Sequence, residues 1–192
     1  MKNLPQTYST KKVLENPANK IAWLYAFCVR EILQEEFEDV TIKPLIMESD
    51  FILAAYKGKS WRKEYGQHLR LIIESPKFSL EVNALDENTV DLYSIISNTK
   101  RQGIGNEVML AVKEAADVFD VDVCLVPVAI KSTNNIHRAE KNAQWLRDWY
   151  EYKRFSECKD SPEMIYHANF LDKAITGDIY GRLKLKELEG AY

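Results

Sequence analysis

The sequence is poor in the residues on which metal and redox sites depend. It has three cysteines, Cys28, Cys124 and Cys158, which stand far apart, and only three histidines. There is no Cys-x-x-Cys pair and no grouping with metal-ligand spacing, which argues against a zinc site. Cys28 and Cys124 lie inside apolar runs, where a small buried side chain is a more frequent role than a reactive thiol. We therefore expect no metal cofactor.

Long apolar runs are also scarce. The longest, residues 21–29, is too short to span a bilayer, and the polar start of the chain lacks the apolar core of a signal peptide. Glycine and proline number only 7 and 6, whereas hydrophobic residues make up 46% of the chain, so the chain can bury a core. We expect a soluble cytoplasmic protein that has no membrane partner.

The chain has no excess of positive charge. The formal net charge of −3 and the isoelectric point of about 5.7 argue against a broad basic face, so nucleic acid is not an expected partner. A length of 192 residues suits one domain of ordinary size. We divide it into a polar N-terminal arm (1–15), one domain (16–169) and a C-terminal helical tail (170–192).

Hydrophobic periodicity predicts the order of helices and strands. Asn16 and Pro17 have the character of an N-cap and a first helical position. The predicted helices are 17–37, 104–119 and 139–152. The predicted extended segments, mostly short and rich in Ile, Leu or Val, are 40–47, 50–56, 68–74, 78–84, 90–96, 121–130 and 162–170, with a hairpin turn at 86–89. This order predicts an α/β fold, or an α+β fold, with a mixed sheet.

The segment 98–106, NTKRQGIGN, joins an alternating apolar strand to a helix. A Walker A loop would need a lysine after its second glycine, and a dinucleotide fingerprint would need a small residue in place of Val108, so both motifs are excluded. A turn with outward N–H groups at a helix start is still sufficient to bind a pyrophosphate. Gly103 and Gly105 permit a close phosphate approach that a Cβ would obstruct. A tight connection without a ligand is the alternative.

At this loop the chain resembles the GNAT superfamily of acyl-CoA-dependent N-acyltransferases. The family's pyrophosphate loop has the form Gln/Arg-x-x-Gly-x-Gly/Ala, and here it reads KRQGIG at 100–105, with Lys100 in the first position. A later family pattern, Tyr-x-x-x-Gly-Phe, corresponds to Tyr150 and Phe155, with Arg154 where glycine is usual. The resemblance covers residues 78–168, about half of the chain.

The resemblance implies a GNAT-like fold. Its central sheet is mostly antiparallel, has helices on both faces, and contains one parallel strand pair that splays apart to admit the pantetheine arm of CoA. Pro127 agrees with this arrangement, because a proline beyond the splay gives up no ladder hydrogen bond.

The resemblance also implies a site. Acetyl-CoA would be the co-substrate, a primary amine of a small molecule or protein would be the acceptor, and a homodimer is compatible with the family. The backbone of Ile95, Ile96 and Ser97 would pair with pantetheine and polarise the thioester carbonyl. Tyr150 would protonate the departing thiolate, with a packing role beside Trp145 and Trp149 as the alternative. The residues implied to bind the pyrophosphate are Lys100, Arg101, Gln102, Gly103, Ile104, Gly105 and Asn106.

The general base has two candidates. By strand alternation, Asp91 shares a face with Tyr93 and Ile95, which would turn its carboxylate toward the acceptor. Glu81, across the hairpin, is the second candidate, and each carboxylate also suits a solvated sheet edge. The leading hypothesis is an N-acetyltransferase. The alternatives are a GNAT-fold CoA-binding or regulatory protein without catalysis, and a nucleotide-binding α/β module.

Overall fold

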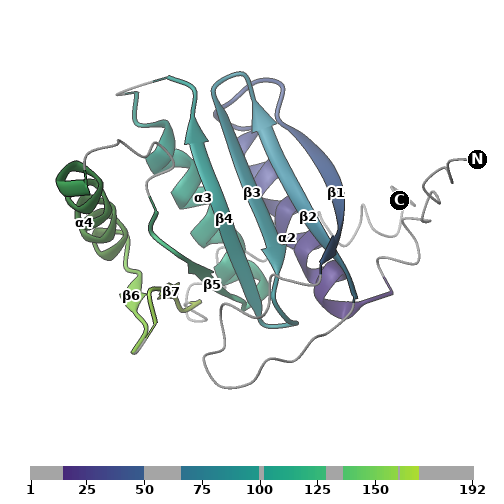
Figure 1. Ribbon diagram of the computed structural model, residues 1–192. Helices are drawn as coiled ribbons and strands as arrows, with labels where there is room; N and C mark the ends of the chain where they lie inside the picture. The colour runs from purple at the N-terminus through teal and green to yellow at the C-terminus, as the bar shows by residue number, and fades with distance from the viewer. Residues whose placement is uncertain (1–14, 50–65, 100–101, 129–135, 160, 169–192) are drawn as a thin grey trace, which may run out of the picture.

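The computed structural model of the chain describes residues 15–49, 66–99, 102–128, 136–159 and 161–168. Seven strands in these segments form one sheet in the order β1-β2-β3-β4-β5-β7-β6 (Figure 1). Every neighbouring pair is antiparallel except β4 and β5, which are parallel. The strands are β1 (Thr41–Ser49), β2 (Gly66–Ser75), β3 (Phe78–Ala84), β4 (Thr89–Ser97), β5 (Asp122–Leu125), β6 (Ser156–Glu157) and β7 (Met164–Tyr166). The predicted mixed α/β fold class is confirmed, and this topology is compatible with a GNAT-like fold.

Two helices, α2 (Pro17–Leu33) and α3 (Ile104–Phe119), cover one face of the sheet (Figure 1). The predicted start of α2 is confirmed, because the Asn16 side chain accepts a hydrogen bond from the N–H of Ala18 at 3.0 Å. The hydroxyl of Tyr25 donates to the carbonyl of Val112 at 2.7 Å, which joins the two helices inside the core.

The predicted end of the first helix, at residue 37, is wrong by about one turn. Helix α2 ends at Leu33, and the chain turns there with the N–H of Phe37 bonded to the Leu33 carbonyl at 2.8 Å. Phe37 is nevertheless buried, and its ring lies 5.1 Å from that of Phe78. The apolar period therefore continued past the helix because Phe37 packs on the core from a turn.

Two of the prolines within predicted strands lie where a sheet tolerates this residue. Pro44 lies in β1, at the edge of the sheet. Pro127 lies beyond β5, because this strand ends at Leu125 instead of extending to residue 130 as predicted. The prediction that Pro127 stands outside the paired region is confirmed. The predicted strand 50–56, the tail 170–192 and nearly all of the N-terminal arm lie outside the described residues.

Candidate functional site

The two parallel strands pair over only a short stretch. Residues Thr89 to Asp91 of β4 are aligned with Asp122 to Cys124 of β5, and β4 then continues to Ser97 without further pairing to β5. A cavity of about 870 Å³ lies where the strands diverge. It is lined by residues 92–97 of β4, by Leu125, Val126 and Val128 after the paired part of β5, by Glu81, and by helix α4 (Ile136–Tyr152). The structure thus brings the predicted residues Ile95, Ile96, Ser97 and Tyr150 into one site.

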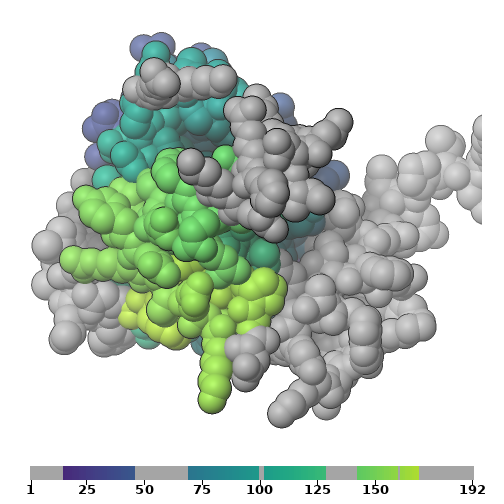
Figure 2. All heavy atoms as spheres, turned by 60° about the vertical axis from the view of Figure 1, so that its left-hand side comes forward, coloured from purple at the N-terminus to yellow at the C-terminus, as the bar shows by residue number. Residues whose placement is uncertain are grey.

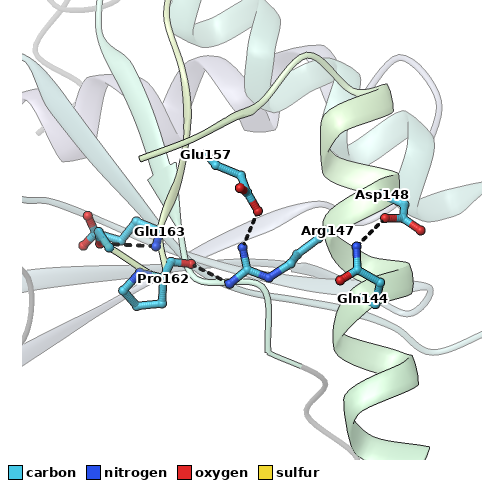
Figure 3. Close-up of polar contacts among 7 residues, drawn as sticks. Gln144, Arg147, Asp148, Glu157, Pro162 and Glu163 are labelled. Atoms are coloured by element: carbon cyan, nitrogen blue, oxygen red, sulfur yellow. Dashed lines mark hydrogen bonds and ion pairs between the residues drawn. The ribbon is translucent and has the colours of Figure 1, made fainter. Parts of the chain in front are cut away.

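Helix α4 forms the far wall of the cavity, which it lines with Asn142, Trp145, Leu146 and Tyr150. Arg147 ties the helix to the sheet (Figure 3). Its Nη1 lies 2.8 Å from Oε1 of Glu157 on β6, and its Nη2 donates to the carbonyl of Pro162 at 3.5 Å. In Figure 2, α4 and the β6–β7 segment occupy much of the face that is turned forward. These contacts attach α4 to the β6–β7 segment, and Tyr150 on this helix lines the cavity between the diverging strands.

Backbone hydrogen bonds at the end of α4 connect Tyr150 with Phe155. The N–H of Phe155 bonds to the carbonyl of Tyr150 at 3.0 Å, and the N–H of Arg154 bonds to the carbonyl of Glu151 at 2.8 Å. These two bonds form a Schellman motif, in which Arg154 is the left-handed residue with φ 71°. Glycine is favoured at such a position because it has no Cβ, so Arg154 occupies it with a strained backbone.

Tyr150 lines the cavity and also packs against other aromatic rings. Its ring lies 4.8 Å from that of Trp149 and 5.6 Å from that of Phe155. Burial raises the pKa of Tyr150 to about 12. The catalytic and packing roles expected for Tyr150 are therefore compatible with each other, although the isolated protein makes this hydroxyl a weaker acid than free tyrosine.

Exposed apolar side chains gather around the cavity. Seven large hydrophobic side chains are exposed among the described residues, and four of them line this cavity: Tyr93, Ile96, Val128 and Trp145. Trp145 and Val128 are 63% and 66% exposed. Because such side chains are ordinarily dispersed on a protein surface, their concentration at one cavity indicates a ligand with an apolar part.

The glycine loop leads directly into α3. Gly103 is the N-cap with φ 74°, a conformation that favours glycine, and its carbonyl accepts from the N–H of Asn106 at 2.7 Å. The N–H groups of Ile104 and Gly105 precede the first helical hydrogen bonds and lie at the positive end of the helix. A Cβ at Gly105 would meet nothing within 4 Å, so this side of the loop is open. Lys100 and Arg101 lie outside the described residues.

A bulge in β4 corrects the predicted placement of Asp91. Leu92 is aligned with Val82 and Ser94 with Glu81, so Tyr93 is an extra residue without a partner on β3. The bulge reverses the alternation beyond it, and Ile95 is aligned with buried Leu80 on the helix-covered face. Asp91 and Ile95 therefore do not share a face, which strand parity alone could not reveal.

Asp91 lies behind the cavity and does not line it. The side chain is 1% exposed, and the pKa of its carboxyl is raised to about 6, chiefly by burial. Positive charge on Arg70 and a hydrogen bond from Asn83 oppose this rise, whereas the charge of Glu163 adds to it. Asp91 is thus a buried carboxyl whose pKa lies well above the usual value for aspartate.

Glu81 is the carboxylate that does line the cavity. Its Oε2 lies 3.4 Å from Nη1 of Arg70, and the Arg70 guanidinium stacks 3.8 Å above the ring of Tyr93. Arg70 is only 9% exposed, so this charge is largely desolvated and held by both neighbours. The sequence carried no signal for this trio because it depends on the register of three strands and on the bulge at Tyr93.

The cysteines have the expected buried character. Cys28 and Cys124 are buried, and burial raises the pKa of the Cys28 thiol to about 12 and also raises that of Cys124. Neither is a reactive thiolate near neutral pH. The described segments contain no group of three or more His, Cys, Asp or Glu side chains placed to hold a metal ion.

None of the helices in the described segments is both long and apolar enough to cross a membrane.

Comparison with known proteins identifies no family. No protein-family model matches the chain, and no curated protein matches it. A solved structure, the crystal structure of anti-CRISPR protein AcrVA5, is similar at 22% identity with a TM-score of 0.40, covering 50% of this chain and 97% of that one. Similarity at this level gives no information on activity. The described residues form a mixed α/β sheet that is compatible with a GNAT-like fold.

Proposed function

We propose that the protein is an acyl-CoA-dependent N-acyltransferase, with acetyl-CoA as donor and a primary amine of a small molecule or protein as acceptor. The divergence of β4 from β5 is the observation that carries this proposal. Beyond Asp91 the side of β4 that faces β5 has no pairing to that strand, and the cavity lies against it. Amide groups of a pantetheine arm match such unpaired backbone, because an extended ligand can take the place of the missing strand.

The glycine loop supplies the second half of the proposed donor site. The N-terminus of α3 presents N–H groups and a partial positive charge, which suit a pyrophosphate. Gln102 to Asn106 would surround it, with Lys100 and Arg101 adding charge. The apolar side chains around the cavity, Ile96 and Val128 among them, suit the methylene groups of the arm and the acyl chain.

Acyl transfer in this site requires a proton for the departing sulfur. Tyr150 is the candidate donor, because it is the hydroxyl that α4 contributes to the cavity wall. The raised pKa of Tyr150 weakens it as an acid. A thiolate in the same apolar surroundings is destabilised for the same reason, as Cys28 and Cys124 illustrate, so the two pKa values rise together. The acceptor ammonium would first meet Glu81, the charged side chain of the described cavity wall.

Calorimetric titration of the full chain with acetyl-CoA tests the donor site. We expect saturable heat of acetyl-CoA binding for the wild type. Binding should be at least about tenfold weaker in Val128→Trp, because the larger ring fills part of the cavity, and it should be unchanged in Leu110→Trp. Leu110 is an exposed apolar residue of α3 that does not line the cavity, so it is the matched control. The absence of binding by folded protein at millimolar acetyl-CoA would remove the proposal.

Release of free CoA in the presence of a panel of amines tests the transfer step. Turnover with at least one amine supports catalysis. Saturable CoA binding without turnover for any amine, together with a stable co-purifying partner, would instead support the non-catalytic CoA-binding alternative.

A further inference from the structure

Three buried oxygen atoms without a protein hydrogen-bond partner belong to neighbouring positions of β3 and β4. They are Oδ1 of Asn83, Oδ2 of Asp91 and Oγ of Ser94, and they account for three of the five such side-chain atoms in the described part of the chain. A buried polar atom without a partner is destabilising by about 1–3 kcal/mol. Three such oxygen atoms at neighbouring positions therefore indicate one shared hydrogen-bond partner that the protein itself does not supply.

The register of β3 and β4 places the three side chains on one face. Asn83 is aligned with Asp91, and Glu81, two residues from Asn83, is aligned with Ser94. Since alternate residues of a strand share a face, all four side chains lie on the face that α2 and α3 leave uncovered. Ser94 is also part of the cavity wall, although its Oγ is buried.

Together the three groups offer two hydrogen-bond acceptors and one donor, and a single water molecule can satisfy all three. The Asn83 amide already donates to Asp91, which leaves the Asn83 carbonyl and the second Asp91 oxygen as acceptors. The Ser94 hydroxyl can donate. A single water can donate to both acceptors and accept from Ser94, which gives it the two to four polar partners that buried waters have.

We propose that Asn83, Asp91 and Ser94 bind one internal water that connects Asp91 to the cavity, with Asn83 and Ser94 as positioning residues for Asp91. This inference rests on the proposed acyltransferase function for the direction of proton transfer. The water site itself does not depend on that function. It would let a carboxyl that does not touch the cavity serve as the base for an acceptor within it.

The proton would move in three linked transfers. Rotation of Ser94 about χ1 brings its hydroxyl to the acceptor. The ammonium nitrogen gives one proton to Ser94 Oγ, Ser94 gives its original proton to the water, and the water gives one of its own to Asp91 Oδ2. The amine is left neutral with its lone pair, Asp91 becomes a neutral acid, and Ser94 and the water are regenerated. The charged groups that influence Asp91 are Arg70 on β2 and Glu163 before β7, and Cys124 faces it from β5.

Two measurements on the full chain without CoA test the water site. A high-resolution crystal structure should show one water within about 3.2 Å of all three oxygens. A carbon-13 NMR titration of the aspartate carboxyls, with Asp91 assigned from Asp91→Asn, should give a midpoint raised by about half to one pH unit in Ser94→Ala, because the water then stabilises the carboxylate less. Ser94→Thr, which keeps the hydroxyl, should retain the wild-type midpoint.

Ser79→Ala is the matched control. Ser79 lies on the same face of β3 but is aligned with Ile96 and lies outside the cavity wall, so its loss should leave the Asp91 midpoint unchanged. An empty position between the three oxygens, or equal Asp91 midpoints in wild type and Ser94→Ala, would overturn the inference.

The activity measurement separates this inference from the proposed function. If acetyl-CoA binds and is turned over, the acid limb of the pH profile of turnover should shift in Ser94→Ala by the same amount as the Asp91 midpoint. An acid limb that does not shift would refute proton transfer through Ser94 and the water. If acetyl-CoA does not bind, the acyltransferase proposal fails and the proton transfer fails with it, whereas the crystallographic and NMR results still decide the water site.

Discussion

Replacement of Asp91 by asparagine should stabilise the protein at neutral and alkaline pH. The pKa of this carboxyl rises from 3.8 to about 6 on folding, and that difference corresponds to about 3 kcal/mol of penalty on the charged form. Asparagine carries no charge and keeps an oxygen that can accept from Asn83. Its added N–H can also donate to the Asn83 carbonyl, which has no partner among the described residues. We expect a gain of about 2–3 kcal/mol at pH 8.

The sign of the pH dependence follows from the raised pKa. Below about pH 4 the carboxyl is protonated in both the folded and unfolded states, so the substitution should change stability little. Between about pH 4 and pH 6 the unfolded chain releases this proton while the folded protein retains it, and the wild type loses stability relative to the variant. Above about pH 6 the full difference is present.

Urea unfolding of both proteins across pH 4 to 8 measures this difference directly. Asp148→Asn is the control, because Asp148 is an exposed carboxylate on α4, and its change should stay within about 0.5 kcal/mol at every pH. A variant at position 91 that is no more stable than the wild type at pH 8, or whose advantage does not shrink toward pH 4, would refute the account of Asp91 as a buried carboxyl held at an energetic penalty.

Four further substitutions test the site and the turns beside it. Tyr150→Phe should lower turnover at least about tenfold while acetyl-CoA affinity stays nearly constant, and unchanged turnover would restrict Tyr150 to packing. Arg154→Gly should raise the free energy of unfolding by up to about 1 kcal/mol by relieving the positive φ, and a loss in urea unfolding would show that the Arg154 side chain stabilises this turn. Gly103→Ala should destabilise by about 1–2 kcal/mol because of its φ of 74°, whereas Gly105→Ala, inside the first turn with open space around it, should not destabilise. Equal effects in urea unfolding would contradict this account of the loop. Acetyl-CoA affinity that survives Gly105→Ala would mean that no phosphate approaches closely there.

Features with a local cause could be predicted from the sequence. The Asn16 cap, the start of α3 after Gly103 and the hairpin between β3 and β4 each depend on residues a few positions apart. The position of Pro127 outside the paired strands could also be predicted, because a missing N–H restricts where a proline can lie in a sheet. The placement of Ile95 to Ser97 and Tyr150 around one cavity was inferred through the family resemblance.

The relation between Asp91 and the cavity could not be predicted in this way. Strand alternation assigned Asp91 to the face of Ile95, but one extra residue at Tyr93 changes the alternation for the rest of β4. No local pattern marks such a bulge, because it depends on the alignment of β4 with β3. The Arg70, Glu81 and Tyr93 contacts depend on the same alignment.

The sequence alone determined the class of the fold, the strand, glycine turn and helix around Gly103, and the buried character of Cys28 and Cys124, since these follow from hydrophobic period and backbone freedom. Only the tertiary structure decided that β4 and β5 separate after Asp91, that α4 lines the resulting cavity, and that Asn83, Asp91 and Ser94 each have a buried oxygen without a protein partner on one face of the sheet. These features depend on strand register and on contacts between distant segments, such as Arg147 with Glu157, whose energies are set by packing and not by neighbours in the chain.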